Sequence, residues 1–167
     1  RPTGISPYNF ECALEDIENS GVDFDAFLVA GDLSELGDDI SYELMWDALD
    51  KTEIDNILLA TGNHDVRVVY DLRTEQIIDK TNGFLGTEID KPYYSYDING
   101  YTFIVMGSDS RLFEKAVISD EQLAFIDAEL ERATKDGKPA FVMCHQPLEN
   151  THGLPEVWKN GGIGEQS

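Results

Sequence analysis

The sequence predicts an α/β fold in which helices alternate with short buried strands. Three continuous apolar runs, at residues 26–30, 56–61 and 140–144, predict strands that are buried on both faces. A segment with helical spacing separates the first two runs, as a crossover between parallel strands requires. An Asn-Gly pair between two further strand-like runs adds a hairpin, so the expected sheet is mixed. The 167 residues favour a single domain, residues 1–167.

The helices expected in the first half of the chain cover residues 8–19, 41–49 and 69–79. In the first of them, Phe10, Leu14 and Ile17 recur at intervals of three or four residues and form one apolar face. Asp39 or Ser41 is expected to cap the second helix, because short polar side chains accept hydrogen bonds from the first helical N–H groups.

The second half of the chain predicts a hairpin, a long helix and a last strand. Strands over 93–98 and 101–107 meet at Asn99-Gly100, where both residues tolerate positive φ. A helix is expected over 119–134, because Ser119 with Gln122 three residues later matches a capping box. Its expected apolar stripe consists of Leu123, Ile126, Leu130 and Ala133. The last strand, 140–144, runs directly into a histidine.

The charge of the chain excludes several classes of partner. With 33 acidic and 12 basic residues, the net charge of −21 argues against wrapping nucleic acid or docking on an anionic membrane. No apolar run is long enough to span a membrane. Cys12 and Cys144 lie far apart without a CxxC motif, so a disulfide framework is not expected and a reducing, cytoplasmic location is favoured. Export stays open if a signal peptide precedes residue 1.

Each of the three apolar runs ends on a side chain that can bind metal: Asp32, Asn63 and His145. Ligands collect at the carboxyl ends of the strands in an open α/β sheet, so we expect these side chains to converge. Mixed oxygen and nitrogen donors suit Mn, Fe, Zn or Ni and exclude a thiolate zinc site. Gly31 and Gly62 allow a sharp turn and a close approach there. The alternative is that Gly-Asp and Gly-Asn are ordinary turn pairs.

These motifs together resemble those of the calcineurin-like metallophosphoesterase family, and the residues around them are similar to the sequences of its bacterial branch. The matching segments are Ala30-Gly31-Asp32-Leu33-Ser34, Ala60-Thr61-Gly62-Asn63-His64-Asp65 and Cys144-His145-Gln146-Pro147-Leu148. The resemblance implies the family's four-layer α/β/β/α sandwich with mixed sheets. It also implies metal-dependent hydrolysis of phosphate mono- or diesters, with a small phosphate ester or a phosphoprotein as substrate.

The resemblance also implies roles for four residues. Asp32 would bridge two divalent metal ions, and Asn63 and His145 would ligate the second of them. His64 would act on the leaving group as general acid or stabiliser, and the alternative is a structural histidine that caps its own turn. Two cations in such a site neutralise phosphoryl oxygens during in-line attack by water.

Two motifs of the family are missing from this chain. Members carry an Asp-x-His motif before the Gly-Asp motif and a Gly-His-x-His motif near the end, whereas the histidines here are His64, His145 and His152. We therefore expect a chain truncated at both ends, with an incomplete fold that binds metal weakly and hydrolyses little alone. The flanking residues would supply the remaining ligands.

Three further residues are candidates for supporting roles. Asp65 either orients His64, ties down the following loop or caps the next helix. Arg67 either reaches a substrate phosphate or forms a surface ion pair. His152 either lines the substrate cleft or lies on a solvated loop.

Two other functions stay open at this point. One is a non-catalytic interaction scaffold with the same fold, although a scaffold has no need of Asp32, Asn63, His64 and His145. The other is a nucleotide-specific phosphodiesterase of the same family. The oligomeric state is also left open.

Overall fold

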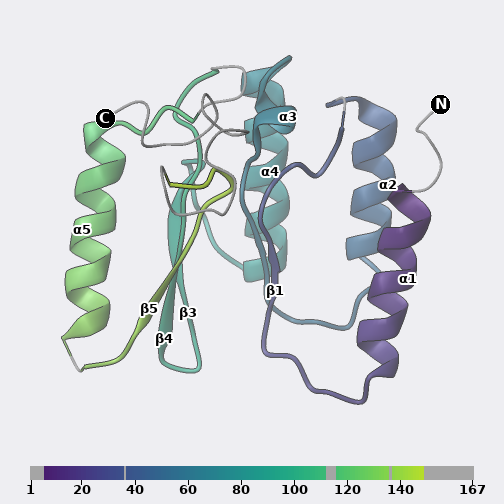
Figure 1. Ribbon diagram of the computed structural model, residues 1–167, viewed down its shortest axis with the longest axis horizontal. Coiled ribbons are helices and arrows are strands. Elements are labelled where there is room, and N and C mark those ends of the chain that lie inside the picture. The colour runs from purple at the N-terminus through teal and green to yellow at the C-terminus, as the bar shows by residue number, and fades with distance from the viewer. Residues whose placement is uncertain (1–5, 36, 112–115, 136, 149–167) are drawn as a thin grey trace.

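The computed structural model describes residues 6–35, 37–111, 116–135 and 137–148, and these form five helices and five strands. Figure 1 shows the elements arranged in layers, with α1 and α2 at one side of the molecule, the two sheets in the middle and α5 at the other side. The expected four-layer α/β/β/α arrangement with two sheets is confirmed. The helices are α1 (Ser6–Asn19), α2 (Asp39–Leu49), α3 (Asn63–Val66), α4 (Tyr70–Leu85) and α5 (Asp120–Thr134).

The first sheet has two parallel strands, β1 (Phe27–Val29) and β2 (Ile57–Leu59). The second sheet has the order β3-β4-β5 and is mixed, as predicted. In it, β3 (Tyr94–Ile98) is antiparallel to β4 (Tyr101–Val105), and β4 is parallel to β5 (Ala140–Met143). The predicted hairpin is confirmed at Asn99-Gly100, where φ is 52° and 78°.

The two faces of β2 build two cores. Ile57 and Leu59 pack in a cluster with side chains of α2 and α4, including Tyr42, Leu49 and Ile77. On the opposite face, Leu58 joins a second cluster with residues of the other sheet; its buried members are Leu58, Ala60, Leu85, Tyr94, Ile98 and Val105. The first sheet is therefore covered by helices on one face and by the second sheet on the other.

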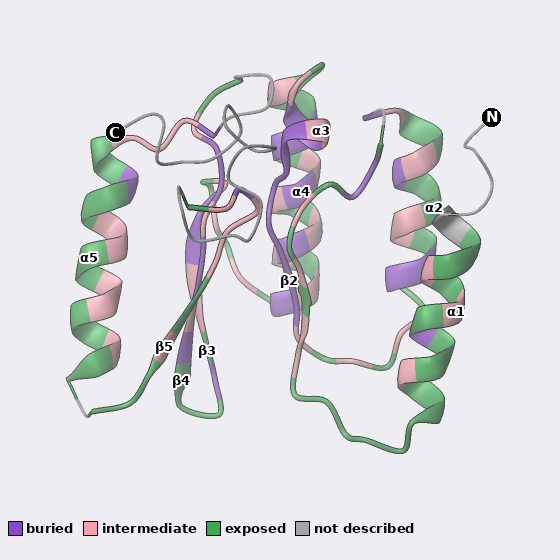
Figure 2. Ribbon diagram, viewed as in Figure 1, coloured by how far each residue is buried: buried purple, intermediate pink, exposed green. Residues whose placement is uncertain are grey.

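The sequence predicted burial on both faces for β1, β2 and β5, and only β2 is buried in this way. Every residue of β2 is at most 2% exposed, whereas Leu28 in β1 is 44% exposed and Phe141 and Val142 in β5 are 48% and 47% exposed. Figure 2 shows β2 in purple and much of β5 in green. The prediction is wrong for β1 and β5. In β1, Phe27 and Val29 pack against the first cluster, whereas Leu28 on the opposite face is largely exposed. In β5, the adjacent residues Phe141 and Val142 point to opposite faces, and both are largely exposed.

The helix ends differ in detail from those predicted. The N-cap of α2 is Asp38, which accepts from Ser41 N at 3.0 Å, and neither Asp39 nor Ser41 is the cap. Helix α4 runs on to Leu85, six residues past its predicted end. The short helix α3 has no predicted counterpart, because its four residues were interpreted as a loop.

The capping box predicted for α5 is made only in part. Ser119 accepts from Gln122 N at 3.1 Å, but the Gln122 side chain bonds to Gly107 and Asp109 instead of returning to Ser119. The backbone N–H of Ser119, which Gln122 would accept in a full capping box, donates to Asp109 at 2.9 Å instead. Gln122 is fully buried and Leu123 is 50% exposed, so Leu123 does not belong to the buried stripe.

No described helix is long and apolar enough for a transmembrane segment. Both cysteines, Cys12 and Cys144, are free thiols, as expected.

Candidate metal site

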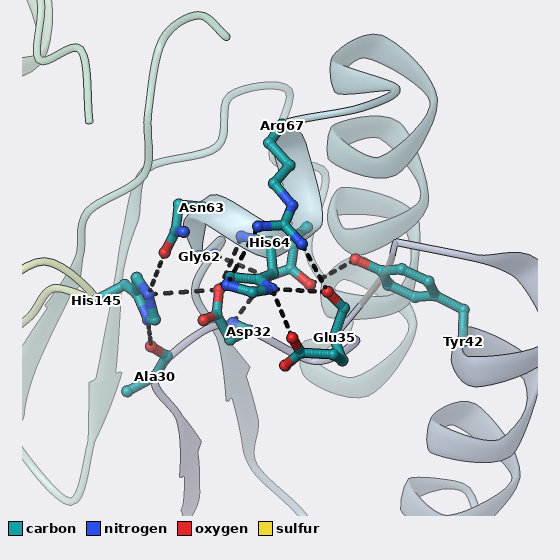
Figure 3. Close-up of polar contacts among 10 residues, drawn as sticks. Ala30, Asp32, Glu35, Tyr42, Gly62, Asn63, His64, Arg67 and His145 are labelled. Atoms are coloured by element: carbon teal, nitrogen blue, oxygen red, sulfur yellow. Dashed lines mark hydrogen bonds and ion pairs between the residues drawn. The ribbon is translucent and has the colours of Figure 1, made fainter. Parts of the chain in front are cut away.

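Three side chains from both sheets meet where β1, β2 and β5 end. Asp32 follows β1, Asn63 is the first residue of α3 directly after β2, and His145 follows β5. The His145 Nε2 atom lies 3.0 Å from Asn63 Oδ1 and 3.4 Å from Asp32 Oδ1. Figure 3 shows the three side chains pointing toward one another. The structure thus brings together the three side chains that the sequence analysis selected at the strand ends.

The hydrogen bonds of His145 determine which atom it presents to the other two side chains. Its Nδ1 lies 2.8 Å from the Ala30 carbonyl oxygen, which can only accept, so Nδ1 carries the proton. In the neutral imidazole, Nε2 then offers a lone pair toward two oxygen atoms that are also acceptors. A histidine that ligates a metal typically donates its other N–H to a backbone carbonyl or a carboxylate in this way.

This donor set fits a divalent cation. One imidazole nitrogen, one amide oxygen and one carboxylate oxygen suit borderline metals such as Mn, Fe or Zn. Among the described residues no group of three or more His, Cys, Asp and Glu side chains could hold a metal, and the third atom beside Asp32 and His145 is the amide oxygen of Asn63. Burial raises the pKa of the neighbouring Cys144 thiol, which opposes the thiolate that a sulfur ligand requires.

The two glycines at the strand ends allow the turns to approach each other closely. A Cβ atom on Gly62 would lie 2.2 Å from Asp32 Oδ1, and a Cβ on Gly31 would lie 2.7 Å from Gly62 N. Gly31 has φ 90°, and the next residue, Asp32, has φ 53° although it is not glycine. The sharp turn expected at Gly31 is confirmed by its positive φ, and both glycines let the two turns pack against each other. The close approach to an ion or a phosphate that we expected of them stays a prediction.

Asp65 ties the two turns together. It is fully buried, and its Oδ2 accepts from Gly62 N at 2.7 Å and from Asp32 N at 2.9 Å. Its Oδ1 accepts from the Tyr42 hydroxyl at 2.6 Å. Burial raises the pKa of Asp65, while these hydrogen bonds act in the opposite direction. Asp65 therefore caps α3 and joins it to the turn after β1. None of its hydrogen bonds within the described chain reaches the His64 side chain.

The His64 ring is held by the turn after β1 instead. Its Nδ1 lies 2.6 Å from the Glu35 carbonyl oxygen, and its backbone N–H donates to Asp32 Oδ1 at 2.9 Å. Because a carbonyl only accepts, Nδ1 is the protonated nitrogen, and Nε2 faces Arg67 Nη1 at 3.4 Å. The ring bonds to a residue 29 positions away, so it does not cap its own turn.

Arg67 lies beside His64 and is partly exposed. Its Nη2 donates to the Glu35 carbonyl at 3.1 Å, the same oxygen that accepts from His64. The Glu35 side chain itself is 81% exposed, with its carboxylate 3.7 Å from His64 Nδ1. His152, the last residue proposed for the site, lies outside the described residues.

Sequence reasoning missed the groups that hold these side chains in place. The carbonyls of Ala30 and Glu35 orient the two histidines, and every residue has a carbonyl, so no sequence signal marks them. Tyr42 was also missed. Its position on the buried face of α2 indicates core packing, and nothing in the sequence shows that its hydroxyl reaches Asp65.

A comparison with known families finds a match that covers most of the chain. A family model described as calcineurin-like phosphoesterase matches residues 4–163, nearly the whole chain. No curated protein matches the chain.

Proposed function

The chain belongs to the calcineurin-like phosphoesterase family, whose members are typically metal-dependent. We therefore propose that it takes part in the hydrolysis of phosphate mono- or diesters at a dinuclear metal site. Asp32, Asn63 and His145 are the proposed ligands. The observation that carries this proposal is the convergence of three lone-pair atoms on one point, with His145 Nδ1 already committed to the Ala30 carbonyl. Without a cation, a neutral His145 would place these acceptors against each other unfavourably.

The Asp32 carboxylate has the geometry for a bridging ligand. Its Oδ1 accepts from His64 N and lies toward His145, whereas its Oδ2 makes no hydrogen bond within the described chain. One third of this side chain is exposed, so a second cation can approach Oδ2. The backbone N–H of His64 fixes the Oδ1 position and leaves the other oxygen available.

The cations would supply Lewis-acid polarisation of the phosphoryl oxygens and a water nucleophile of lowered pKa. They would also offset the net charge of −21, which otherwise repels an anionic ester. His64 and Arg67 act on the leaving-group side in this proposal. The guanidinium beside His64 Nε2 provides hydrogen-bond donors for a developing negative oxygen. The substrate is a small phosphate ester or a phosphoprotein.

The test is titration of the chain with Mn²⁺, read by paramagnetic broadening of the His145 ring signals. We expect broadening in the wild-type chain and more than about tenfold weaker Mn²⁺ binding in Asp32→Asn, because the substitution removes the ligand charge. Asparagine tolerates the positive φ and keeps an acceptor for His64 N, so the fold is expected to survive. Circular dichroism checks the fold.

The matched control is Glu35→Gln, which removes one exposed negative charge beside His64 without touching a proposed ligand. Its Mn²⁺ affinity should stay close to wild type. Release of p-nitrophenolate from the mono- and bis-p-nitrophenyl phosphates then tests hydrolysis and separates monoester from diester preference. Equal Mn²⁺ affinity in wild type and Asp32→Asn would contradict the ligand assignment. Turnover is expected to be low, because two motifs that carry the family's other ligands are missing from this chain. A folded chain that binds no Mn²⁺ would favour an interaction scaffold.

A further inference from the structure

The Tyr42 hydroxyl contacts the candidate metal site from a helix that carries none of the proposed ligands. Tyr42 lies on α2, which contributes no ligand, and its side chain is 2% exposed. The hydroxyl donates to Asp65 Oδ1 at 2.6 Å, a short bond to a fully buried carboxylate. Burial raises the pKa of Tyr42, so the group remains an O–H donor.

Asp65 transmits this contact to both turns that carry the proposed ligands. Its Oδ2 accepts the backbone N–H of Asp32 and the backbone N–H of Gly62, which directly precedes Asn63. Asp32 stands at φ 53°, a conformation that L residues seldom adopt, so it depends on such bonds to stay in place. Rotation of the Asp65 carboxylate would release both turns at once.

The Tyr42 ring is itself held on two sides, which fixes the direction of its hydroxyl. The Trp46 ring packs against it with centroids 5.4 Å apart, and the Arg73 guanidinium lies 4.7 Å from its centroid. Arg73 is 3% exposed and donates to the Gly37 carbonyl at 2.9 Å and to Asp39 at 2.6 Å. These contacts link α4, the start of α2 and the ring into one rigid support.

We propose that Tyr42 is a positioning residue of the site, which sets the Asp32 carboxylate and the start of α3 by orienting Asp65. Its effect on cation binding rests on the function proposed above. If Tyr42 only filled space in the core, its aromatic ring would be sufficient, and phenylalanine would fill the same space. The hydroxyl has Asp65 as its hydrogen-bond partner, so its contribution can be separated from that of the core.

The variant Tyr42→Phe tests this, with Tyr94→Phe as the matched control. Tyr94 is equally buried, and its hydroxyl bonds to the backbone of Leu59 instead of Asp65. The first measurement, which needs no metal, is amide hydrogen exchange at Asp32 and Gly62. We expect these two amides to exchange about tenfold faster in Tyr42→Phe than in wild type. In Tyr94→Phe they should exchange faster only by the factor that its loss of global stability, measured by urea denaturation, accounts for.

The second measurement is Mn²⁺ affinity. Loss of a group that orients ligands typically costs about 10–100-fold in metal affinity, so Tyr42→Phe should bind at least tenfold more weakly than wild type. In an Asp65→Asn background the same substitution should cost little more, because its effect passes through the Asp65 carboxylate. A core defect would instead lower stability without this dependence on residue 65.

The outcomes separate the two proposals. Unchanged exchange at Asp32 and Gly62 in folded Tyr42→Phe overturns the positioning role, whatever the metal result. Unchanged Mn²⁺ affinity in Tyr42→Phe, with binding in wild type, overturns its effect on the cation. If wild type binds no Mn²⁺ but exchange accelerates as expected, Tyr42 positions the two turns and the proposed function fails.

Discussion

The two sheets differ in how they use polar groups. On the first sheet, a buried network from Tyr42 through Asp65 holds the turns after β1 and β2, where Asp32 and Asn63 lie. On the second sheet, the polar network is exposed. It joins Asp97 of β3 to Arg132 of α5, with side chains 51% and 46% exposed. One network is largely buried and holds the turns that carry two proposed ligands, whereas the other is exposed to solvent and ties a helix to a strand.

The difference shows that the two sheets contribute unequally to the candidate site. The first sheet and its helices provide two proposed ligands and their support, and the second sheet provides His145 alone. Close packing of the sheets is therefore needed to bring His145 to the other two. Tyr94 bridges the sheets, since its hydroxyl accepts from Leu59 N at 2.9 Å and donates to Leu59 O at 3.1 Å.

The largest expected effect comes from Gly62→Ala in the buried network. The new Cβ would lie 2.2 Å from Asp32 Oδ1 and 2.3 Å from Asp32 N, and the backbone atom cannot move aside cheaply. We expect a loss of about 3 kcal/mol in the free energy of unfolding, at the upper end for overpacking. Urea denaturation measures it, and Mn²⁺ binding should be lost with it.

Gly83→Ala is the control for the same substitution. Gly83 lies within α4, and apart from its chain neighbours and the nearby helix backbone no atom lies within 4 Å of a Cβ built there. Alanine should therefore stabilise the chain by about 0.5–1 kcal/mol through helix propensity. A Gly62→Ala chain as stable as wild type would contradict the close packing of the two turns.

Sequence reasoning located the proposed ligands because strand order decides where they lie. Parallel strands present their carboxyl ends at one edge of a sheet, so the runs that end at Asp32 and Asn63 predict that these two side chains lie close together. His145 follows a strand of the other sheet, so its place beside them also depends on the packing of the two sheets. Metal ligation by these residues, and the catalytic role of His64, stay predictions. The truncation expected from the missing motifs also stays a prediction.

The features that the sequence did not predict depend on tertiary packing, which the periodicity of apolar residues does not reveal. A strand covered on both faces and a strand left partly uncovered can have the same apolar composition, so β5 was predicted to be buried although Phe141 is 48% exposed. Helix α3 is a single turn over a motif rich in polar residues, too short for a helical period to be detected. The link from Tyr42 to Asp65 spans 23 residues and requires the packing of α2 against β2.

An intermediate effect is expected where the two sheets meet. Tyr94→Phe removes two hydrogen bonds to the Leu59 backbone and leaves buried polar groups without their partner. We expect the free energy of unfolding to fall by about 1–2 kcal/mol. Tyr96→Phe is the control, because the Tyr96 hydroxyl makes only a long contact of 3.5 Å to Leu85 O and its loss should cost well under 1 kcal/mol. Equal losses in the two variants would show that Tyr94 does not fasten the sheets.

The smallest effect is expected in the exposed network, and it should depend on pH. Hydrogen bonds from Arg132 and Thr102 lower the native pKa of Asp97 below its unfolded value, which is about 3.9. The ionised carboxylate therefore contributes its full stability above the unfolded pKa, and this contribution is lost as pH falls through the native pKa. Asp97→Asn should cost at most about 1 kcal/mol at pH 7, because the pair is half exposed.

Urea midpoints of wild type and Asp97→Asn, measured from pH 7 down to pH 3, test this dependence. The difference between the two chains should narrow once the pH falls below about 4, and added salt should narrow it at pH 7. Asp127→Asn, an exposed change on α5, the helix that carries Arg132, is the control for a general loss of negative charge. A difference that stays constant down to pH 3 would mean that Asp97 acts through packing. The exposed network would then resemble the buried one more closely than its solvent exposure indicates.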